Sequence, residues 1–317
     1  MKNQHNYHGL IGPVDDARRE RLFSIAEVIQ SSSKRTTTLR FPDYNDLERS
    51  ALNDLPLDGP KTLLPLPRML ADYSQLIRNG VPVVSEPQFQ KLALPIIDRS
   101  LEAAFGNSAD VGDQGVNVAL PSPKRVSAYV VISERLRLQN DLLTSSWVEQ
   151  QLLSALGRAL DKAAIIGDGN GDNPLGFLND GILNHTRATA GIDTLTDITA
   201  MQKAISDADG EANPENYLFV ADAATRQALQ TAEGIGNPIW SKDGPLGHAG
   251  IASVHCPADT LVLAQTSAMA FIDFNRLELE NVIDVDQATA GYRQMMLTGY
   301  FDFVTLDPNG ICQAVDA

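Results

Sequence analysis

Eight of the 17 prolines lie between residues 42 and 95, and they restrict what this segment can fold into. Proline has no amide donor, so it interrupts helices and central strands. The sequence therefore predicts an extended arm over residues 41–97, with one short helix at 67–78. A structureless segment of this length is unusual in a lone compact domain, which indicates that the arm lies across other surfaces. The prolines are Pro42, Pro56, Pro60, Pro65, Pro67, Pro82, Pro87 and Pro95.

The clearest helix is predicted at residues 146–166. Ser146 and Glu149 match the S-x-x-E capping box, and apolar residues recur behind them at helical spacing. About 21 residues at ~1.5 Å each make a rod about 30 Å long. We expect the helix to end at Gly167, in the left-handed conformation that glycine favours there. The apolar stripe consists of Val148, Leu152, Leu156, Ala159, Ala163 and Ile166.

The segment GDGNGDNPLG, directly after this helix, resembles a calcium loop in part. Asp168, Asn170 and Asp172 occupy positions 1, 3 and 5 of an EF-hand-like loop. Such a loop needs Gly at position 6 and a bidentate Glu at position 12. This chain has Asn173 and Asn179 at those positions, so the pattern argues against calcium.

The same segment does not match a phosphate-binding loop either. Gly171 and Gly176 have the required spacing, but Phe177 and Leu178 replace the Lys and Ser/Thr that contact the phosphates. A phosphate loop also opens a helix, whereas this segment closes one. The sequence favours a chain reversal in which Asp and Asn side chains accept from nearby backbone amides.

The rest of the chain alternates helices and strands, which predicts an α+β fold. Upstream, an amphipathic helix at 14–30, with Asp15 and Asp16 in its first turn, is followed by a polar hinge. A two-stranded β-ribbon is predicted over roughly 98–133, with 125–133 as its second strand. Downstream, helices are predicted at 193–209 and 222–232, strands at 216–222, 259–274, 277–285 and 294–308, and a Gly/Pro loop at 233–250.

Composition excludes several classes of function. The net charge is −15 and the pI is about 4.7, whereas sequence-specific nucleic-acid readers are usually basic. No apolar run is long enough for a transmembrane helix, and no signal-peptide core precedes residue 24, so we expect a cytoplasmic protein. Cys256 and Cys312 cannot form a disulfide framework and are predicted to be buried thiols.

No constellation of residues predicts catalysis, a cofactor or a metal. His248, His255 and Cys256 lack a fourth ligand at zinc spacing. The pairs Ser133/Glu134 and Ser241/Lys242 have no nucleophile motif such as G-x-S-x-G around them. One cluster of basic residues is best interpreted as a solvated helix face. The alternative is that it contacts a neighbouring subunit or packaged nucleic acid. It comprises Arg18, Arg19, Arg21, Lys34, Arg35 and Arg40.

The order of ribbon, long helix and glycine turn resembles tailed-phage major capsid proteins, over about residues 95–317. The turn matches that family's G-D-G-x-G-x-P-x-G pattern, with one extra residue before Pro174. The resemblance implies an α+β major-capsid fold with an N-terminal arm, an extended β-ribbon loop, a spine helix in a peripheral domain, and an axial domain. The implied segments are 1–40 (helix and hinge), 41–97 (arm), 98–133 (ribbon), 134–191 with 282–317 (peripheral domain) and 192–281 (axial domain).

The resemblance also implies a structural function and no enzymatic one. Pentamers and hexamers would close an icosahedral head shell around the phage DNA. The implied partners are other copies of the chain, a scaffolding protein, a portal, a decoration protein and non-specifically held double-stranded DNA, without a membrane. The protein would assemble in the host cytoplasm and reside in the virion. Either residues 1–40 act as a short scaffolding segment, or a separate protein provides the scaffolding.

Some relatives crosslink their shells through a ribbon Lys and a peripheral-domain Asn, assisted by a Glu. Lys124 is the possible ribbon Lys, and Asp302 stands near the Glu position. Met295 stands where the Asn belongs, so no catalytic residue is assigned.

Two other functions remain open at this point. An encapsulin-type compartment shares the fold and encloses an enzyme, with residues 14–30 available for a cargo-binding groove. A calcium-binding soluble hydrolase would be built around Asp168, Asn170 and Asp172, and would be a monomer or small oligomer.

Overall fold

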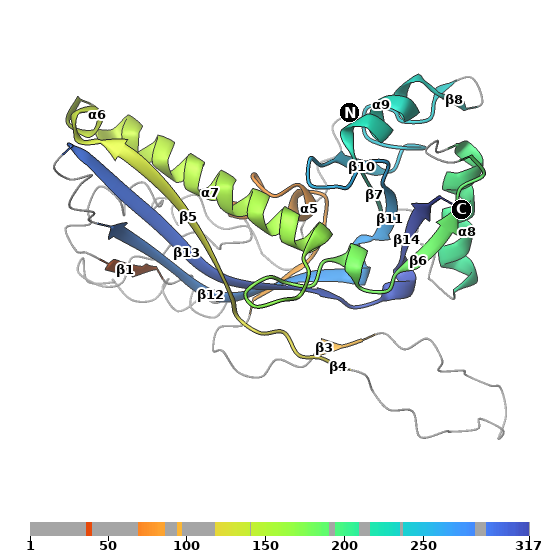
Figure 1. The fold of residues 1–317 in the computed structure, drawn as a ribbon, viewed down its shortest axis with the longest axis horizontal. Helices are drawn as coiled ribbons and strands as arrows, with labels where there is room; N and C mark the ends of the chain where they lie inside the picture. The colour runs from red at the N-terminus through yellow and green to blue at the C-terminus, as the bar shows by residue number, and fades with distance from the viewer. Residues whose placement is uncertain are drawn as a thin grey trace, which may run out of the picture. The chain divides into compact units, whose positions relative to one another are not determined.

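The computed structural model describes residues 36–39, 69–85, 94–96, 118–139, 141–189, 194–208, 216–234, 237–282 and 290–316 (Figure 1). The predicted helix at 14–30, the basic cluster and the middle of the ribbon lie outside these ranges. The chain divides into two compact units. Each is described separately below.

The first unit comprises Met1–Met69, Ala128–Leu152 and Arg276–Thr298. It holds β1 (Thr36–Leu39), α6 (Glu134–Gln139) and parts of four elements that continue beyond it. These are β5 (Lys124–Ser133), α7 (Asp141–Ile166), β12 (Met269–Val282) and β13 (Tyr292–Thr305). The strand order is β1-β12-β13-β5, with β2 (Val83–Ser85) also paired to β12. Among the described residues, strand β5 therefore lies at the edge of this sheet.

The long helix α7 begins at Asp141, so the predicted capping box at Ser146 and Glu149 is wrong. Thr144 donates a hydrogen bond to the carbonyl of Leu136 in α6 (3.4 Å). The helix therefore extends back to a packing contact that periodicity alone does not reveal. Its buried stripe also differs from the prediction after Leu156, because Leu160 and Ala164 are buried while Ala159 is exposed.

The second unit comprises Leu70–Ser127, Leu153–Asn275 and Gly299–Ala317. Its five-stranded sheet has the order β10-β7-β11-β14-β6. Strand β11 is antiparallel to both its neighbours, whereas β10 with β7 and β14 with β6 are parallel pairs. The strands are β6 (Leu183–Thr186), β7 (Tyr217–Ala221), β10 (Ala249–Ala252), β11 (Leu261–Gln265) and β14 (Ile311–Val315).

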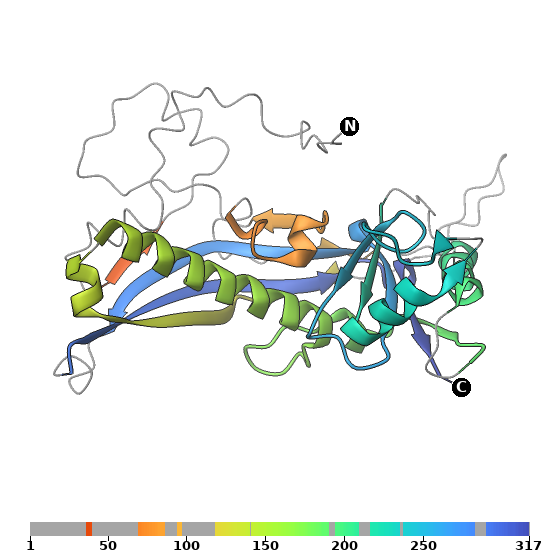
Figure 2. The same cartoon turned by 90° about the horizontal axis from the view of Figure 1, so that it is seen from above.

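Two helices, α8 (Leu195–Asp207) and α9 (Ala223–Thr231), pack against this sheet. Helix α8 contacts β14 and β6 (Figure 2). Every residue of β7 and β11 is buried, as expected for strands covered on both faces. The core includes Ile198, Met201 and Ile205 of α8 with Phe219, Leu229, Trp240, Leu261, Leu263 and Cys312.

Several short elements complete the second unit. They are α5 (Gln75–Arg78), β2, β3 (Leu94–Pro95), β4 (Val118–Ala119), β8 (Glu233–Gly234), β9 (Asn237–Pro238), and the 3-10 helices η1 (Phe177–Asn179), η3 (Thr266–Ala268) and η4 (Pro308–Gly310). Strands β3 and β4 pair antiparallel, and α5 lies within the short helix predicted at 67–78.

The predictions of α8, β7 and α9 are confirmed within two residues at each end, and that of β13 within three. Two strands were expected at 259–274 and 277–285, and the predicted boundary between them is wrong. The chain breaks instead at Thr266–Ala268, and β12 continues through Asn275 to Val282 because pairing with β1 and β2 holds it extended. Strands β6 and β14 were not predicted, since neither carries a long β-branched run.

Candidate functional site

The glycine-rich turn is a chain reversal closed by its own backbone. Gly176 donates to the carbonyl of Gly167 (2.9 Å), and Asp168 forms an antiparallel bridge with Leu175. Positive φ angles occur at Gly169 (72°) and Gly171 (59°), so the left-handed prediction for Gly167 is wrong. Gly167 is needed for close approach, because a Cβ there would lie 2.0 Å from the carbonyl oxygen of Pro174.

The side chains considered as calcium ligands bind one another and the turn. The exposed Asp168 carboxylate accepts from the Asn170 amide (3.2 Å), from Asn170 Nδ2 (3.2 Å) and from Asn173 Nδ2 (2.6 Å). These donors, led by the Asn170 amide, lower the pKa of Asp168. Asn179 donates to the carbonyl of Gly167 (2.7 Å) and thus ties η1 to the end of α7. In the described residues no three His, Cys, Asp or Glu side chains gather in a way that could hold a metal ion.

The two residues carried over from the crosslinking relatives lie together. Lys124 Nζ of β5 lies 3.1 Å from Asp302 Oδ1 of β13, and the Lys124 and Asp302 side chains are only 16% and 5% exposed. Asp302 also accepts from the amides of Ser122 (2.8 Å) and Phe303 (2.9 Å). Met295 is buried and offers no amide group.

A buried carboxylate anchors the last part of the predicted arm to α7. Asp161 accepts from Ser74 Oγ (2.6 Å) and from the amides of Gln75 (2.8 Å) and Leu76 (3.3 Å). Burial raises the pKa of Asp161, and the hydrogen bonds from Ser74, Gln75 and Leu76 oppose that rise. One turn earlier, a Cβ on Gly157 would lie 2.7 Å from the carbonyl carbon of Tyr73. Tyr73 and Ser74 therefore lie directly on the helix backbone.

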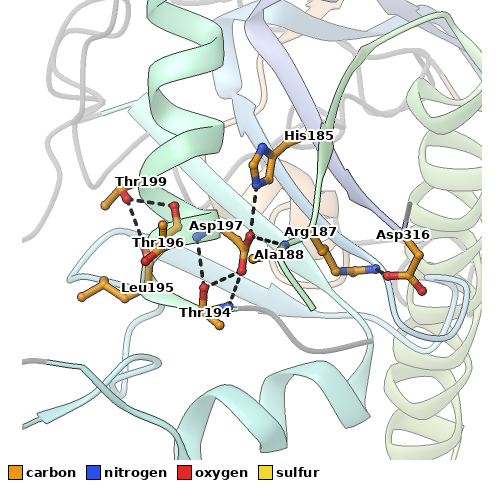
Figure 3. Close-up of polar contacts among 9 residues, drawn as sticks. All are labelled: His185, Arg187, Ala188, Thr194, Leu195, Thr196, Asp197, Thr199 and Asp316. Carbon is orange, nitrogen blue, oxygen red and sulfur yellow. Dashed lines mark hydrogen bonds and ion pairs between the residues drawn. The ribbon is translucent and has the colours of Figure 1, made fainter. Parts of the chain in front are cut away.

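A second polar network organises the start of α8 (Figure 3). Thr194 and Asp197 form a reciprocal capping box, and Asp197 Oδ1 also accepts from the Ala188 amide and lies 3.1 Å from His185 Nε2. Burial raises the pKa of Asp197, but the hydrogen bonds from Thr194, Ala188 and His185 outweigh it and lower the pKa to about 2. The T-x-x-D spacing is the sequence signal for this cap, and the prediction of a helix at 193–209 does not use it.

Arg187 joins three separate parts of the same unit. It is buried, and its Nη1 lies 2.9 Å from Asp316 Oδ1 near the end of the described chain (Figure 3). Its Nη2 donates to the carbonyl oxygen of Asp259, in the loop before β11. The network therefore stabilises the sheet edge at β6.

The remaining candidates have structural partners. His248 Nε2 lies 3.3 Å from Gln202 Nε2, and its ring meets Tyr217 edge-on. Both thiols are buried as predicted. Burial, with a contribution from Asp222, raises the pKa of Cys256 to about 12, and burial raises the pKa of Cys312 to about 11.

The two serine pairs do not form a nucleophile and base. Ser133 Oγ accepts from the Leu136 amide (3.4 Å), and Glu134 forms an ion pair with Arg293 (2.8 Å). Ser241 Oγ donates to the carbonyl of Gly244 (2.9 Å), while Lys242 is exposed. Each serine has a turn or capping role.

The chain has the fold of tailed-phage capsid proteins. The elements that define it are the 26-residue helix α7, the ribbon strand β5, the two 14-residue strands β12 and β13, and a separate mixed sheet. The chain belongs to the Phage capsid family, whose model matches residues 106–316. It is 28% identical over 189 residues to the major capsid protein of Halomonas phage phiHAP-1. That match covers 59% of this chain and 30% of the relative, so it spans less than a third of the curated relative's length.

Solved structures show the same fold at low sequence identity. The capsid of a native GTA particle aligns with a TM-score of 0.56 at 14% identity, covering 84% of this chain and 95% of that one. A virus-like particle from Pyrococcus furiosus gives 0.53 at 12% identity, covering 79% and 96%. Mycobacterium phage Adephagia gives 0.51 at 14% identity, covering 77% and 90%. No helix in the described part of the chain has the length and apolar character to span a membrane.

Proposed function

We propose that this chain is the structural subunit of an icosahedral phage head, built from its pentamers and hexamers. The observation that carries the proposal is a concentration of exposed apolar side chains in the first unit. Six of the ten exposed large hydrophobic residues in the described part of the chain lie there. They are Tyr129, Val131, Leu136, Leu138, Trp147 and Tyr292. Exposed apolar side chains grouped in this way mark interaction surfaces, and aromatic residues dominate such contacts.

The edge strand β5 shows how this surface arises. Ala128 and Ile132 are buried, while Tyr129 and Val131 between them are 69% and 40% exposed. Alternation of this kind places one set of side chains in the core and the other on the open face. The amide of Glu134 donates to the carbonyl of Gly291 (2.8 Å), which brings the end of β5 to the start of β13. The open face therefore continues towards Tyr292.

The finer parts of the proposal follow from the family. The shell encloses double-stranded DNA, which it holds without reading its sequence, and the net charge of −15 limits adhesion to phosphates. Scaffolding, portal and decoration proteins are its partners, and the virion, assembled in the host cytoplasm, is its location. The proposed division of the chain stays as the resemblance implies it. It comprises a helix and hinge (1–40), an arm (41–97), a ribbon (98–133), a peripheral domain (134–191 with 282–317) and an axial domain (192–281).

Expression of the full chain alone tests the proposal. We expect megadalton particles in the void volume of a size-exclusion column, and closed shells or hexamer sheets by negative-stain electron microscopy. Nucleic acid inside the shells would support the phage head, whereas a co-purified enzyme would favour the encapsulin alternative. A monomer whose melting temperature rises with calcium would overturn the proposal in favour of the calcium-binding protein.

A further inference from the structure

Leu246 has a backbone conformation that leucine rarely adopts. Nine described residues have positive φ angles, and seven of them are glycines. The other two are Leu246 (53°) and Asp259 (56°). Asp is tolerated in the left-handed region because its short polar side chain can bond locally, whereas a bulky side chain there is strained. The chain therefore keeps leucine where glycine or asparagine would be more stable.

The loop around Leu246, residues 240–250, imposes this conformation. The Leu246 amide donates to the carbonyl of Ile239 (3.2 Å), and the Gly250 amide donates to the carbonyl of Asp243 (2.8 Å). Trp240, buried in the core, bridges to Pro245. At Gly244 a Cβ would lie 2.2 Å from the carbonyl oxygen of His248. These contacts hold the loop with Leu246 in the left-handed region.

The Leu246 side chain is only partly covered by the described part of the subunit. The Leu246 side chain is 44% exposed, so part of its apolar surface remains in water. Strained backbone that the surrounding structure enforces is concentrated at functional sites. A pre-formed loop also loses little conformational freedom when it binds, which favours affinity.

We propose that residues 240–250 form a contact with a second copy of this chain, in which Leu246 is the apolar anchor. The occupant is argued from charge. Lys242 and Asp243 are adjacent and both exposed on this loop. Opposite charges side by side are self-complementary in a head-to-tail contact between identical subunits, where Lys242 of one copy meets Asp243 of the next. The inference rests on the proposed function and specifies one of its interfaces.

The first test replaces Leu246 with asparagine, which tolerates the left-handed conformation. We expect Leu246→Asn subunits to melt at or above the wild-type temperature, because strain is relieved. The concentration at which particles form, measured by light scattering and sedimentation, should rise about tenfold, because an apolar anchor is lost from each contact. Leu246→Gly should act in the same direction. Asp259→Asn is the matched control, since it retains the same backbone angle at a polar residue, and it should leave assembly unchanged.

The second test uses the charges. Lys242→Asp and Asp243→Lys should each raise the assembly concentration, and the double swap should restore it, because the head-to-tail pair is rebuilt in reverse. Normal assembly of Leu246→Asn, or no recovery in the double swap, would overturn the inference while wild-type shells still support the proposed function. A wild-type chain that forms no particle under any condition would overturn both.

Discussion

The two units differ in how completely they bury their apolar side chains. In the second unit, β7 and β11 are completely buried and α8 covers the sheet with Ile198, Met201 and Ile205. In the first unit, the edge strand β5 buries alternate residues only and leaves Tyr129 69% exposed. The second unit thus has a complete core of its own. The first has the unfinished surface of a protein that is completed by its neighbours. Apart from the loop around Leu246, substitutions should therefore affect folding in the second unit and assembly in the first.

The largest expected effect on subunit stability lies in the closed sheet. Phe219 is fully buried in β7, and Phe219→Ala removes its contacts and leaves a cavity. We expect a loss of about 3–5 kcal/mol in the free energy of unfolding, measured by urea denaturation of dissociated subunits. A loss below about 1 kcal/mol would show that this sheet is less tightly packed than its burial indicates.

The next effect is the pH dependence produced by Asp197. Its pKa is lowered from 3.8 to about 2, so the folded state favours the charged form. The stabilisation is fully present above pH 3.8 and is lost as the pH falls towards 2. A shift of this size corresponds to roughly 2 kcal/mol. Denaturation between about pH 5 and 2, compared with Asp197→Asn, measures it. A variant with an unchanged acid profile would exclude Asp197 as the source.

A smaller effect is expected where residues 69–85 meet α7. Ser74 caps α5, accepting from the Ile77 amide at 3.2 Å, and donates to Asp161. Ser74→Ala should cost about 1 kcal/mol, typical of a lost N-cap, and Ser267→Ala at an exposed position serves as the control. Equal melting temperatures for the two variants would contradict an anchoring role for this contact.

The sequence predicts local features of both units better than their long-range contacts. Helix α8 and strand β7 follow from periodicity and apolar runs, and the glycine turn follows from its Asp and Asn side chains. The Ser74–Asp161 contact joins residues 87 positions apart, so no local pattern indicates it. The start of α7 depends on packing against α6, which overrode the capping-box pattern at Ser146.

The pair Lys124 and Asp302 was also only partly predictable from the sequence. The resemblance alone selected Lys124 and Asp302, and the fold brings them together. The left-handed angle of Leu246 was not predictable, because leucine carries no signal for that conformation. It results from the surrounding hydrogen bonds and from glycines that permit close backbone approach.

The smallest expected effect on stability separates the two units most clearly. Tyr129 lies on the open face of β5, so Tyr129→Ser should change the free energy of unfolding by no more than about 0.5 kcal/mol, as is usual for exposed positions. The same substitution should prevent or strongly reduce particle formation, because it removes an aromatic side chain from the surface that neighbouring copies would cover. Val254→Ser, at an 87% exposed residue of the second unit, is the matched control. If both variants assemble normally, the open face of β5 is not an interface. If Tyr129→Ser instead unfolds the subunit, that face belongs to the core of the first unit, and the contrast between the two units fails.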